Sequence, residues 1–352
     1  KYLQGKIGDT LNALAVNQAF NRLDLFLTDY LTETSIPCSP ASAPAPGTAV
    51  TVRLDKVDVF TGASDIGQGS DTVVAQIVAE VLGIPIDDVN VINNDTDICP
   101  WDVGVHASRT TFVAGNAALG AALKIKAQIL EVAAKLLDED PTWLDIKNGA
   151  VFSTKNTEKS TPLGKALRKV HYTLGGKMLM AEYFYDPKNE NFDKDFKGNL
   201  SVSYAYGAHG VEVEVDKETG QVKILNYIAA HDVGKAINPL LLEGQIYGGG
   251  LQGVGYALGE KMIYEKGELK NGNFLDYKMP TAKDIPPVQA VIVETDEKDG
   301  PFGAKGIGEP GLVPTAPAIA NAIYDAVGVR IKDLPITPEK VLKALKEKEK
   351  KV

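Results

Sequence analysis

The chain has 352 residues, of which 44% are hydrophobic, and it carries a formal net charge of -9 at pH 7. This length suits two domains or one large one, with a sizeable buried core. The acidic balance argues against nucleic acid or an anionic membrane surface as the main partner. The two cysteines, Cys38 and Cys99, are too few for a disulfide framework or for an iron–sulfur cluster held by four thiolates.

The remaining metal-binding residue types show no ligand pattern either. The four histidines are scattered along the chain, at His106, His171, His209 and His231, and none has the spacing of a metal site. No apolar run reaches the length of a membrane-spanning helix, and the polar first residues show no secretory signal. We therefore expect a cytoplasmic protein without a membrane segment.

The first half of the chain alternates between strand and helix patterns. Apolar residues alternate over 50–60 as in a single strand, and an apolar face recurs over 71–82 as in a helix. Residues 89–92 form a short strand pattern, 93–108 a polar loop, and 110–137 a long alanine-rich helix. The fold class predicted from this order is α/β, with α and β elements mixed.

The second half repeats the order of strand, glycine turn and helix. A hairpin is predicted over 210–228, a helix over 238–259, a strand over 288–293 and a helical run over 316–327. The signal Thr337-Pro338-Glu339 begins a last helix that ends in a solvated charge run. The helix over 238–259 carries seven glycines, which each cost up to about 1 kcal/mol relative to alanine. They indicate tight packing or close approach to a ligand.

Three regions are predicted along the chain. Residues 1–49 form an atypical amino-terminal segment, which contains a Pro/Ala/Ser-rich, linker-like run over 35–46. A first subdomain is expected over 50–195 and a second over 196–352.

The first chemically informative segment is the turn Gly67-Gln68-Gly69. It follows a predicted strand and opens a predicted helix, so its backbone N–H groups could bind an anion such as a phosphate. An ordinary tight turn is an equally good interpretation. No lysine follows the glycines, and the pattern is neither a Walker loop nor a G-x-G-x-x-G fingerprint.

Two further segments carry polar groups near helices. Ala107-Ser108-Arg109 precedes the long helix, and Ser108 is expected to be its N-cap. Gln245 lies in the glycine-rich helix, where its amide could bind the edge of a heterocycle or only a neighbouring backbone group. His106 and His231 are expected to be structural.

The most informative segment runs over 303–311, where Glu309 is the one carboxylate among four glycines and a proline. Glycines allow a backbone to come close to a ligand, and a carboxylate held in such a turn can reach a bound molecule. The alternative is a loop with a solvated glutamate, since short motifs often match by chance.

In this order the segments resemble the molybdenum hydroxylases, the family of xanthine dehydrogenase and aldehyde oxidoreductase. Gly67-Gln68-Gly69 is similar to the G-Q-G cofactor turn of that family, and Gly306-Ile307-Gly308-Glu309 to its G-x-G-E signature. Ala107-Ser108-Arg109 with Ala114-Gly115-Asn116 resembles its A-S-R and A-G-N segments. Asp232-Val233-Gly234, Asn238-Pro239 and Gly244-Gln245 resemble its D-x-G, N-P and G-Q block. The resemblance covers residues 51–345.

The resemblance implies a two-subdomain molybdopterin-binding domain and a set of site residues. Molybdenum would be held by the dithiolene of a molybdopterin, as its cytosine dinucleotide, with no protein ligand to the metal. Gly67, Gln68 and Gly69 would contact the cofactor near the metal, and Gly308 would lie beside it. Ala107, Ser108 and Arg109 would meet its phosphates or pterin, and Gln245 would hydrogen-bond near the metal or pterin.

The resemblance also implies a reaction. Glu309 would be the general base while oxygen from water enters an aromatic, N-heterocyclic, aldehyde or CoA-thioester substrate, or leaves it in the reductive direction. The segments over 300–305 and 334–338 are most similar to those of bacterial members that act on aromatic, N-heterocyclic or CoA-thioester substrates.

Molybdenum subunits of the family are about twice as long as this chain. The resemblance therefore implies a half-subunit, with a second molybdopterin-binding chain or a missing amino-terminal half, and with 2Fe-2S and FAD on partner chains. Two alternatives are a non-catalytic assembly half and an unrelated α/β nucleotide-binding enzyme.

Overall fold

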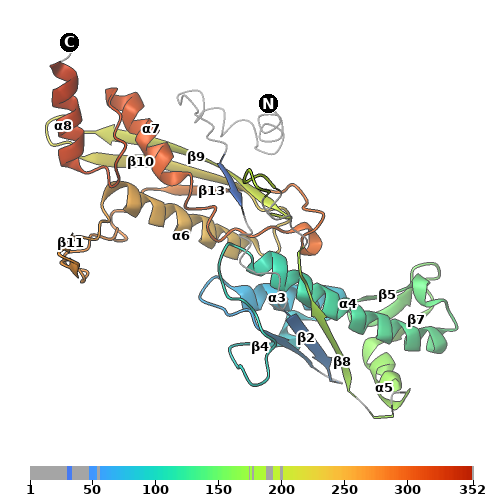
Figure 1. Cartoon of the computed structure of the whole chain (residues 1–352). Coiled ribbons are helices and arrows are strands. Elements are labelled where there is room, and N and C mark those ends of the chain that lie inside the picture. Colours follow the sequence, from blue (N-terminus) through green and yellow to red (C-terminus); the bar gives the residue numbers. More distant parts are fainter. Residues whose placement is uncertain are drawn as a thin grey trace. The chain divides into compact units, whose positions relative to one another are not determined.

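The computed structural model describes residues 30–33, 47–53, 56–173, 175–176, 178–187, 193–198 and 201–350. The linker-like run over 35–46 lies outside these residues. The fold is mixed α/β, as predicted (Figure 1). It divides into two compact units, each described here by itself. Whether they correspond to the two predicted molybdopterin-binding subdomains stays a prediction.

The first unit, called the α3–α4 unit, comprises residues 33–203 and 296–306. Its elements are β2 (Gly47–Val52), β3 (Val57–Thr61), α3 (Ser70–Leu82), η1 (Ile86–Asp88), β4 (Val89–Ile92), α4 (Thr110–Leu137), η2 (Pro141–Trp143), β5 (Leu144–Lys147), β6 (Ala150–Ser153), β7 (Ser160–Pro162), α5 (Leu163–Thr173), β8 (Leu179–Phe184) and η3 (Pro301–Gly303).

A four-stranded sheet of this unit has the order β4-β3-β2-β8. Strands β3 and β4 are parallel and are joined through α3, whereas β2 pairs antiparallel with both β3 and β8. The predicted single strand over 50–60 is wrong, because the chain reverses between β2 and β3. The Arg53 N–H donates to the Lys56 carbonyl oxygen (2.8 Å) and closes that turn. Apolar alternation on both sides of a short turn looks like one strand in the sequence.

The long helix α4 organises the core of this unit. It packs against α3, β2 and β8, and its alanines bring these elements close because they carry only a methyl group. Ala117, Ala118, Ala121 and Ala122 are fully buried. Large aliphatic side chains fill the space around them, namely Val50, Val59, Ile77, Leu82, Ile125 and Ile129.

A second sheet of three strands, β5-β6-β7, is a meander of antiparallel pairs. It lies next to the amphipathic helix α5, which buries Leu163, Ala166 and Val170. The sequence analysis assigned no elements here, because strands of three or four residues are too short to show a clear period.

The second unit, called the α6–α7 unit, comprises the described residues 30–32 together with 204–295 and 307–350. Its elements are β1 (Tyr30–Glu33), β9 (Tyr204–Val215), β10 (Val222–Asp232), α6 (Pro239–Leu258), β11 (Tyr264–Glu265), β12 (Glu268–Leu269), β13 (Val288–Val293), α7 (Thr315–Val327) and α8 (Pro338–Glu349).

The main sheet of this unit has the order β1-β9-β10-β13. Strands β9 and β10 form the predicted hairpin, longer than expected, and β10 and β13 are parallel and joined through α6. Strand, turn, helix and parallel strand therefore occur in both units, as the repeated sequence order indicated. Helix α6 packs against β10 and β13, and α7 packs against β9.

The helix boundaries of this unit follow from local capping. The Asn238 side chain accepts from the Leu241 N–H (3.1 Å) with Pro239 at the first helical position, so the N-P pair starts α6. The Thr337 side chain caps α8 in the same way, as predicted. Gly328, at φ 68°, ends α7.

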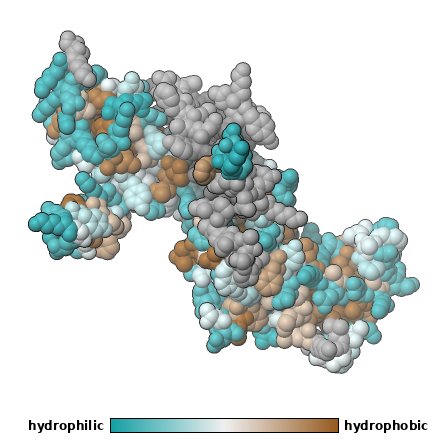
Figure 2. Space-filling view, viewed as in Figure 1, coloured by the Kyte–Doolittle hydropathy of each residue, from teal (hydrophilic) through white to brown (hydrophobic). Residues whose placement is uncertain are grey.

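The hairpin of β11 and β12 lies in a lobe with many exposed side chains. Figure 2 shows hydrophobic side chains among hydrophilic ones in this lobe. Phe274 and Leu275 are the most exposed large apolar residues there, and Tyr264 on β11 is also exposed. Two short strands are only marginally stable alone in water, so this lobe depends on its neighbouring contacts.

Candidate functional site

The Gly67-Gln68-Gly69 turn joins β3 to α3 in the α3–α4 unit, and both glycines have positive φ, 105° and 85°. Its amides are already bound within the turn. The Asp65 carboxylate accepts from the N–H groups of Gly67 (2.7 Å), Gly69 (3.4 Å) and Asp71 (3.3 Å). Three of the N–H groups in and after this turn are therefore satisfied by a resident carboxylate.

The side chain of Gln68 holds the same turn together. Its Oε1 accepts from the Ile66 N–H (2.6 Å), and its amide nitrogen donates to the Ser64 carbonyl oxygen and to Ser70 Oγ (both 3.1 Å). Burial, and then the charge of Asp65, raise the pKa of Asp71, opposed by a hydrogen bond from Asn93. The turn is thus an ordered, partly acidic start of α3.

The Ala107-Ser108-Arg109 segment forms a strained approach to α4. Ala107 and Ser108 both adopt the left-handed region, at φ 51° and 52°, which costs non-glycine residues free energy and clusters at functional sites. The prediction that Ser108 caps α4 was wrong: Arg109 occupies the N-cap position, without a side-chain cap. The left-handed backbone at Ser108 places it outside the helix start.

Arg109 is engaged within its own loop. Its Nη1 donates to Asp102 Oδ1 (3.1 Å) and to the Gly104 carbonyl oxygen (3.4 Å), and both charged side chains are largely buried. Asp102 also accepts from the Gly104 N–H (2.8 Å). The ion pair therefore closes the loop over 102–109 and fixes the guanidinium that the sequence assigned to the cofactor.

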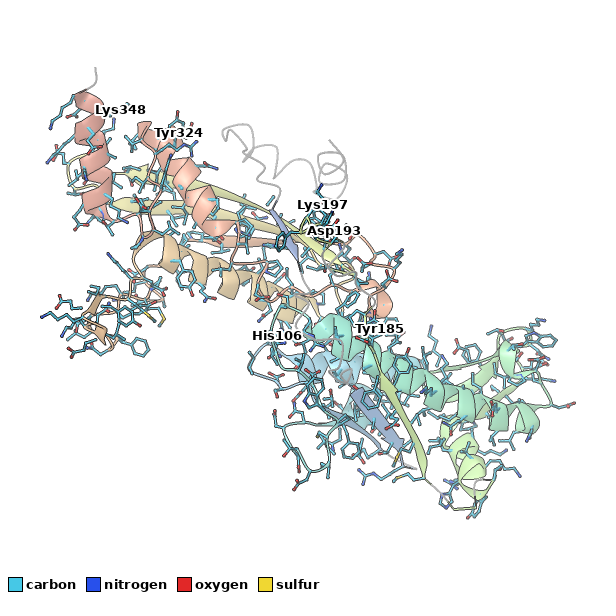
Figure 3. The ribbon with its side chains drawn as sticks, in the orientation of Figure 1. His106, Tyr185, Asp193, Lys197, Tyr324 and Lys348 are labelled. Atoms are coloured by element: carbon cyan, nitrogen blue, oxygen red, sulfur yellow. The ribbon has the colours of Figure 1, made fainter. Side chains whose placement is uncertain are left out.

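The Ala114-Gly115-Asn116 segment seats the chain that leads to Glu309. Asn116 donates to the Asp299 carbonyl oxygen (2.8 Å), and a Cβ on Gly115 would lie 2.9 Å from the Pro301 ring. The hydroxyl of Tyr185, which Figure 3 labels, also donates to the Asp299 carbonyl oxygen (3.5 Å). This motif therefore holds residues 299–301 on α4.

The same unit brings Gly306 against the A-S-R segment. A Cβ on Gly306 would overlap the carbonyl oxygen of Ser108. Two segments that lie nearly two hundred positions apart in the sequence are thus neighbours, and the backbone contact requires glycine. Glu309 follows Gly306 by three positions along the chain.

In the α6–α7 unit, the D-x-G motif forms the turn after β10. The buried Asp232 accepts from the Gly234 N–H (2.9 Å) and from Thr295 Oγ1 (2.7 Å), and Gly234 has φ 62°. This turn aims the chain toward the start of α6. The motif therefore places the helix that carries Gln245.

The glycines of α6 divide into two groups. Added Cβ atoms would strike Gly311 at Gly249 (2.9 Å), the Tyr227 hydroxyl at Gly250 (2.9 Å) and Thr315 at Gly253, so these three allow tight packing. Gly244 and Gly248, one turn apart, would meet no described atom within 4 Å. Tight packing, one of the two explanations that the sequence left open, therefore applies to Gly249, Gly250 and Gly253, and close approach of Gly244 and Gly248 to a ligand stays a prediction.

Gln245 and the turn after Glu309 are neighbours. A Cβ on Gly311 would lie 3.3 Å from the Gln245 carbonyl oxygen. Gly308 and Glu309 are both exposed, and the Leu312 N–H donates to the Glu309 carbonyl oxygen (2.9 Å). Within this unit, the structure brings together Gln245 and the Glu309 turn.

A buried polar cluster, which the sequence analysis missed, lies under this turn. It comprises His209 on β9, Tyr227 and His231 on β10, and Thr315 at the start of α7. Burial lowers the pKa of His231 to about 4, and burial followed by the His231 charge lowers that of His209 well below its usual value. His231 is thus structural, as expected. The one signal in the sequence was the even spacing of Tyr227 and His231 along β10, which places both side chains on the same face of the sheet.

Within the described part of the chain, no group of three or more His, Cys, Asp or Glu residues is arranged to hold a metal ion. The helices of the same residues include none that is long and apolar enough to span a bilayer.

The chain matches the model of the molybdopterin cofactor-binding domain over residues 31–286. It belongs to the molybdenum hydroxylase family. The match begins at residue 31, so the resemblance, which the sequence analysis began at residue 51, was placed too late in the chain. The unrelated nucleotide-binding enzyme is set aside.

Individual relatives agree with this membership. The xanthine dehydrogenase molybdenum-binding subunit of Escherichia coli O157:H7 is 38% identical over 291 residues, covering 81% of this chain and 37% of the relative. The 6-hydroxypseudooxynicotine dehydrogenase complex subunit gamma of Paenarthrobacter nicotinovorans is 37% identical over 301 residues, covering 82% and 36%. The chain therefore spans little more than a third of these curated relatives.

The fold is also that of solved family structures. Quinoline 2-oxidoreductase from Pseudomonas putida 86 superposes with a TM-score of 0.83 at 27% identity, covering 99% of this chain and 46% of that one. The predicted fold class is confirmed.

Proposed function

We propose that this chain is the molybdenum-cofactor-binding part of an oxidoreductase in which Glu309 is the general base. The reaction is hydroxylation of an aromatic, N-heterocyclic, aldehyde or CoA-thioester substrate with oxygen from water, or the reverse dehydroxylation. The cofactor is molybdopterin as its cytosine dinucleotide.

The observation that carries this proposal is the setting of Glu309. Glu309 is an exposed residue of the α6–α7 unit, and the turn that follows it is seated on α6, where a Cβ on Gly311 would lie 3.3 Å from the Gln245 carbonyl oxygen and one on Gly249 would lie 2.9 Å from Gly311. A turn packed against a helix holds its side chain in a defined place, as acid–base chemistry requires. A loop that merely carried a solvated glutamate would not need glycine where it meets α6.

The residues present fit a large, flat cofactor in part. Gly67 in the α3–α4 unit, and Gly244 and Gly248 in the α6–α7 unit, each face space free of described atoms, so a flat group could lie against the backbone in either unit. The Gly67 and Gly69 N–H groups of the G-Q-G turn donate to the Asp65 carboxylate, whose charge disfavours a phosphate at that helix start. We therefore assign the pterin, or an uncharged oxygen of the cofactor, to this turn. The pyrophosphate would lie elsewhere.

When bound, the cofactor would supply a Lewis-acidic metal that activates water and accepts two electrons. The chain's own contributions are binding and proton transfer. Gly308 would contact the cofactor beside Glu309, and the Glu309 carboxylate would take the proton that the activated water loses. Gln245 donates a hydrogen bond to the bound group from α6, and the Arg109–Asp102 pair keeps the loop over 107–109 in its strained shape.

The proposed partners follow from the span of the chain. Because it covers about a third of its curated relatives, we assign the rest of the pocket to a second molybdopterin-binding chain or to a missing amino-terminal half. Electrons would leave through 2Fe-2S and FAD groups on partner chains. The name of the relative from Paenarthrobacter nicotinovorans describes a subunit of a complex.

The test is to purify the native assembly, measure molybdenum and released pterin, and compare Glu309→Gln with the unaltered protein. We expect about one molybdenum per chain in both, with turnover lost only in the variant. Native preparations without molybdenum would overturn the proposal. Unchanged turnover in a molybdenum-loaded Glu309→Gln assembly would favour a non-catalytic assembly half instead.

A further inference from the structure

The α6–α7 unit holds four polar side chains in its apolar core. The two imidazoles meet through their Nε2 atoms (2.7 Å). The Tyr227 hydroxyl lies between His209 Nδ1 (2.8 Å) and Thr315 Oγ1 (2.7 Å). All four residues are buried, and His231 and Thr315 are fully so. These residues are called the His–Tyr–Thr cluster.

Such a cluster is costly, because each polar group loses its hydration and must find a partner inside the protein. The fold also gives up side chains to accommodate it. A Cβ on Gly207 would lie 2.6 Å from the His231 ring, one on Gly250 would lie 2.9 Å from the Tyr227 hydroxyl, and one on Gly253 would lie 2.6 Å from Thr315 Oγ1. Each of these three glycines therefore leaves the space that one residue of the cluster occupies.

The cluster connects to Glu309 through a short run of hydrogen bonds. The Thr315 N–H donates to the Leu312 carbonyl oxygen (3.2 Å), and the Leu312 N–H donates to that of Glu309 (2.9 Å). Thr315 is therefore fixed at its side chain by Tyr227 (2.7 Å) and more weakly by His209 Nδ1 (3.3 Å), and at its backbone by the turn over 309–312. A side chain that holds Thr315 also sets the place of this turn.

We propose that the His–Tyr–Thr cluster is a positioning device for the Glu309 turn, with Tyr227 and Thr315 as positioning residues; the link to catalysis rests on the function proposed above. His209 and His231 are held on the sheet by β9 and β10. Tyr227 links His209 to Thr315 through the hydrogen bonds of its hydroxyl. Removing the Tyr227 hydroxyl leaves Thr315 Oγ1 with only its longer contact to His209 Nδ1 (3.3 Å) and so loosens the turn, while the ring still fills the core.

The test is amide hydrogen exchange on the full chain, with Tyr227→Phe and Thr315→Val compared with Thr315→Ser. Both hydroxyl-removing variants should speed exchange at the Leu312 and Thr315 amides by roughly two- to tenfold, the worth of one hydrogen bond. Amides of β13 should keep their rates, and Thr315→Ser should restore the protection. Tyr324→Phe, on the exposed side of α7 (Figure 3), is the matched control.

Unchanged exchange at Leu312 and Thr315 would overturn the proposal, and so would an equal increase across α6, β10 and β13, which would mean general loosening. In the assembled enzyme, Tyr227→Phe should lower kcat by about 10- to 100-fold with a smaller effect on KM, because a displaced base slows the chemical step. Normal turnover in Tyr227→Phe together with lost turnover in Glu309→Gln would refute the positioning role of the cluster and leave the proposed function standing. Normal turnover in Glu309→Gln would instead refute the proposed function.

Discussion

Gly306 lies so close to Ser108 that a single methyl group on the glycine would overlap the carbonyl oxygen of the serine. Ser108 holds a left-handed conformation, at φ 52°, that turns this oxygen toward the glycine loop. The contact joins the A-S-R segment to the segment that leads to Glu309. It explains why the first glycine of G-x-G-E is needed, independently of any ligand.

We expect Gly306→Ala to lower the free energy of unfolding by roughly 1–3 kcal/mol, the usual cost of overpacking. Gly164→Ala in α5 is the matched control, because a Cβ there meets no described atom within 4 Å. Thermal unfolding of the full chain measures both. Equal melting temperatures for Gly306→Ala and the unaltered chain would show that this backbone contact is not close in solution.

The sequence predicted most long elements of the fold. Helices over 110–137 and 239–258 and the strand over 288–293 were found because their apolar periods are long and their caps are explicit. The reversal between β2 and β3 was missed because alternation continues on both sides of a short turn. The β5-β6-β7 meander was missed because its strands are too short to show a period.

The candidate site was only partly visible in the sequence. Motifs locate Glu309 and Gln245, but no spacing shows that Asp65 binds the amides of the G-Q-G turn or that Asp102 binds Arg109. The His–Tyr–Thr cluster was hidden for the same reason. His209 and His231 look scattered in sequence and meet only because β9 and β10 pair in a particular register.

Two glycines of α6 should respond in opposite directions to alanine. Gly253→Ala places a methyl group against Thr315 and should lower the free energy of unfolding, whereas Gly248→Ala fills open space. The second change should raise that free energy by up to about 1 kcal/mol, the difference in helix propensity. Denaturant unfolding of both variants is the measurement. Stabilisation by Gly253→Ala would contradict the packing described for Thr315.

Asp65→Asn should weaken the start of α3. The carboxylate accepts three backbone N–H groups, and loss of a comparable cap typically costs about 0.5–2 kcal/mol. The variant should also lower the pKa of Asp71, which burial raises first and the charge of Asp65 second. Chemical unfolding and a carboxyl titration by NMR measure the two effects. Asp325→Asn, on α7, provides a surface control, and an equal loss in both variants would count against the cap.

The buried histidines predict how stability depends on pH. Their pKa values are lowered in the folded chain, that of His231 to about 4, whereas an unfolded histidine titrates near about 6.5. Below that value the unfolded state binds more protons, so the free energy of unfolding should fall as pH drops from 7 toward 5, by up to about 1.4 kcal/mol per pH unit for each histidine. His231→Gln should flatten this dependence, and His171→Gln should not. A pH-independent free energy of unfolding over this range would show that the pair is not buried and neutral.

Glu309→Gln tests the proposed chemistry most directly. The amide keeps the shape of the side chain and the turn but cannot take a proton, and loss of a general base typically costs about 10²–10⁴-fold in rate. The turn is held by backbone contacts through Gly311 and Leu312, so molybdenum content should stay unchanged. Steady-state turnover and elemental analysis of the assembled enzyme are the measurements, with Glu347→Gln on α8 as the matched control. A variant that loses its molybdenum together with its activity would instead make Glu309 a cofactor-binding residue, because the loss of turnover would then follow from an empty site.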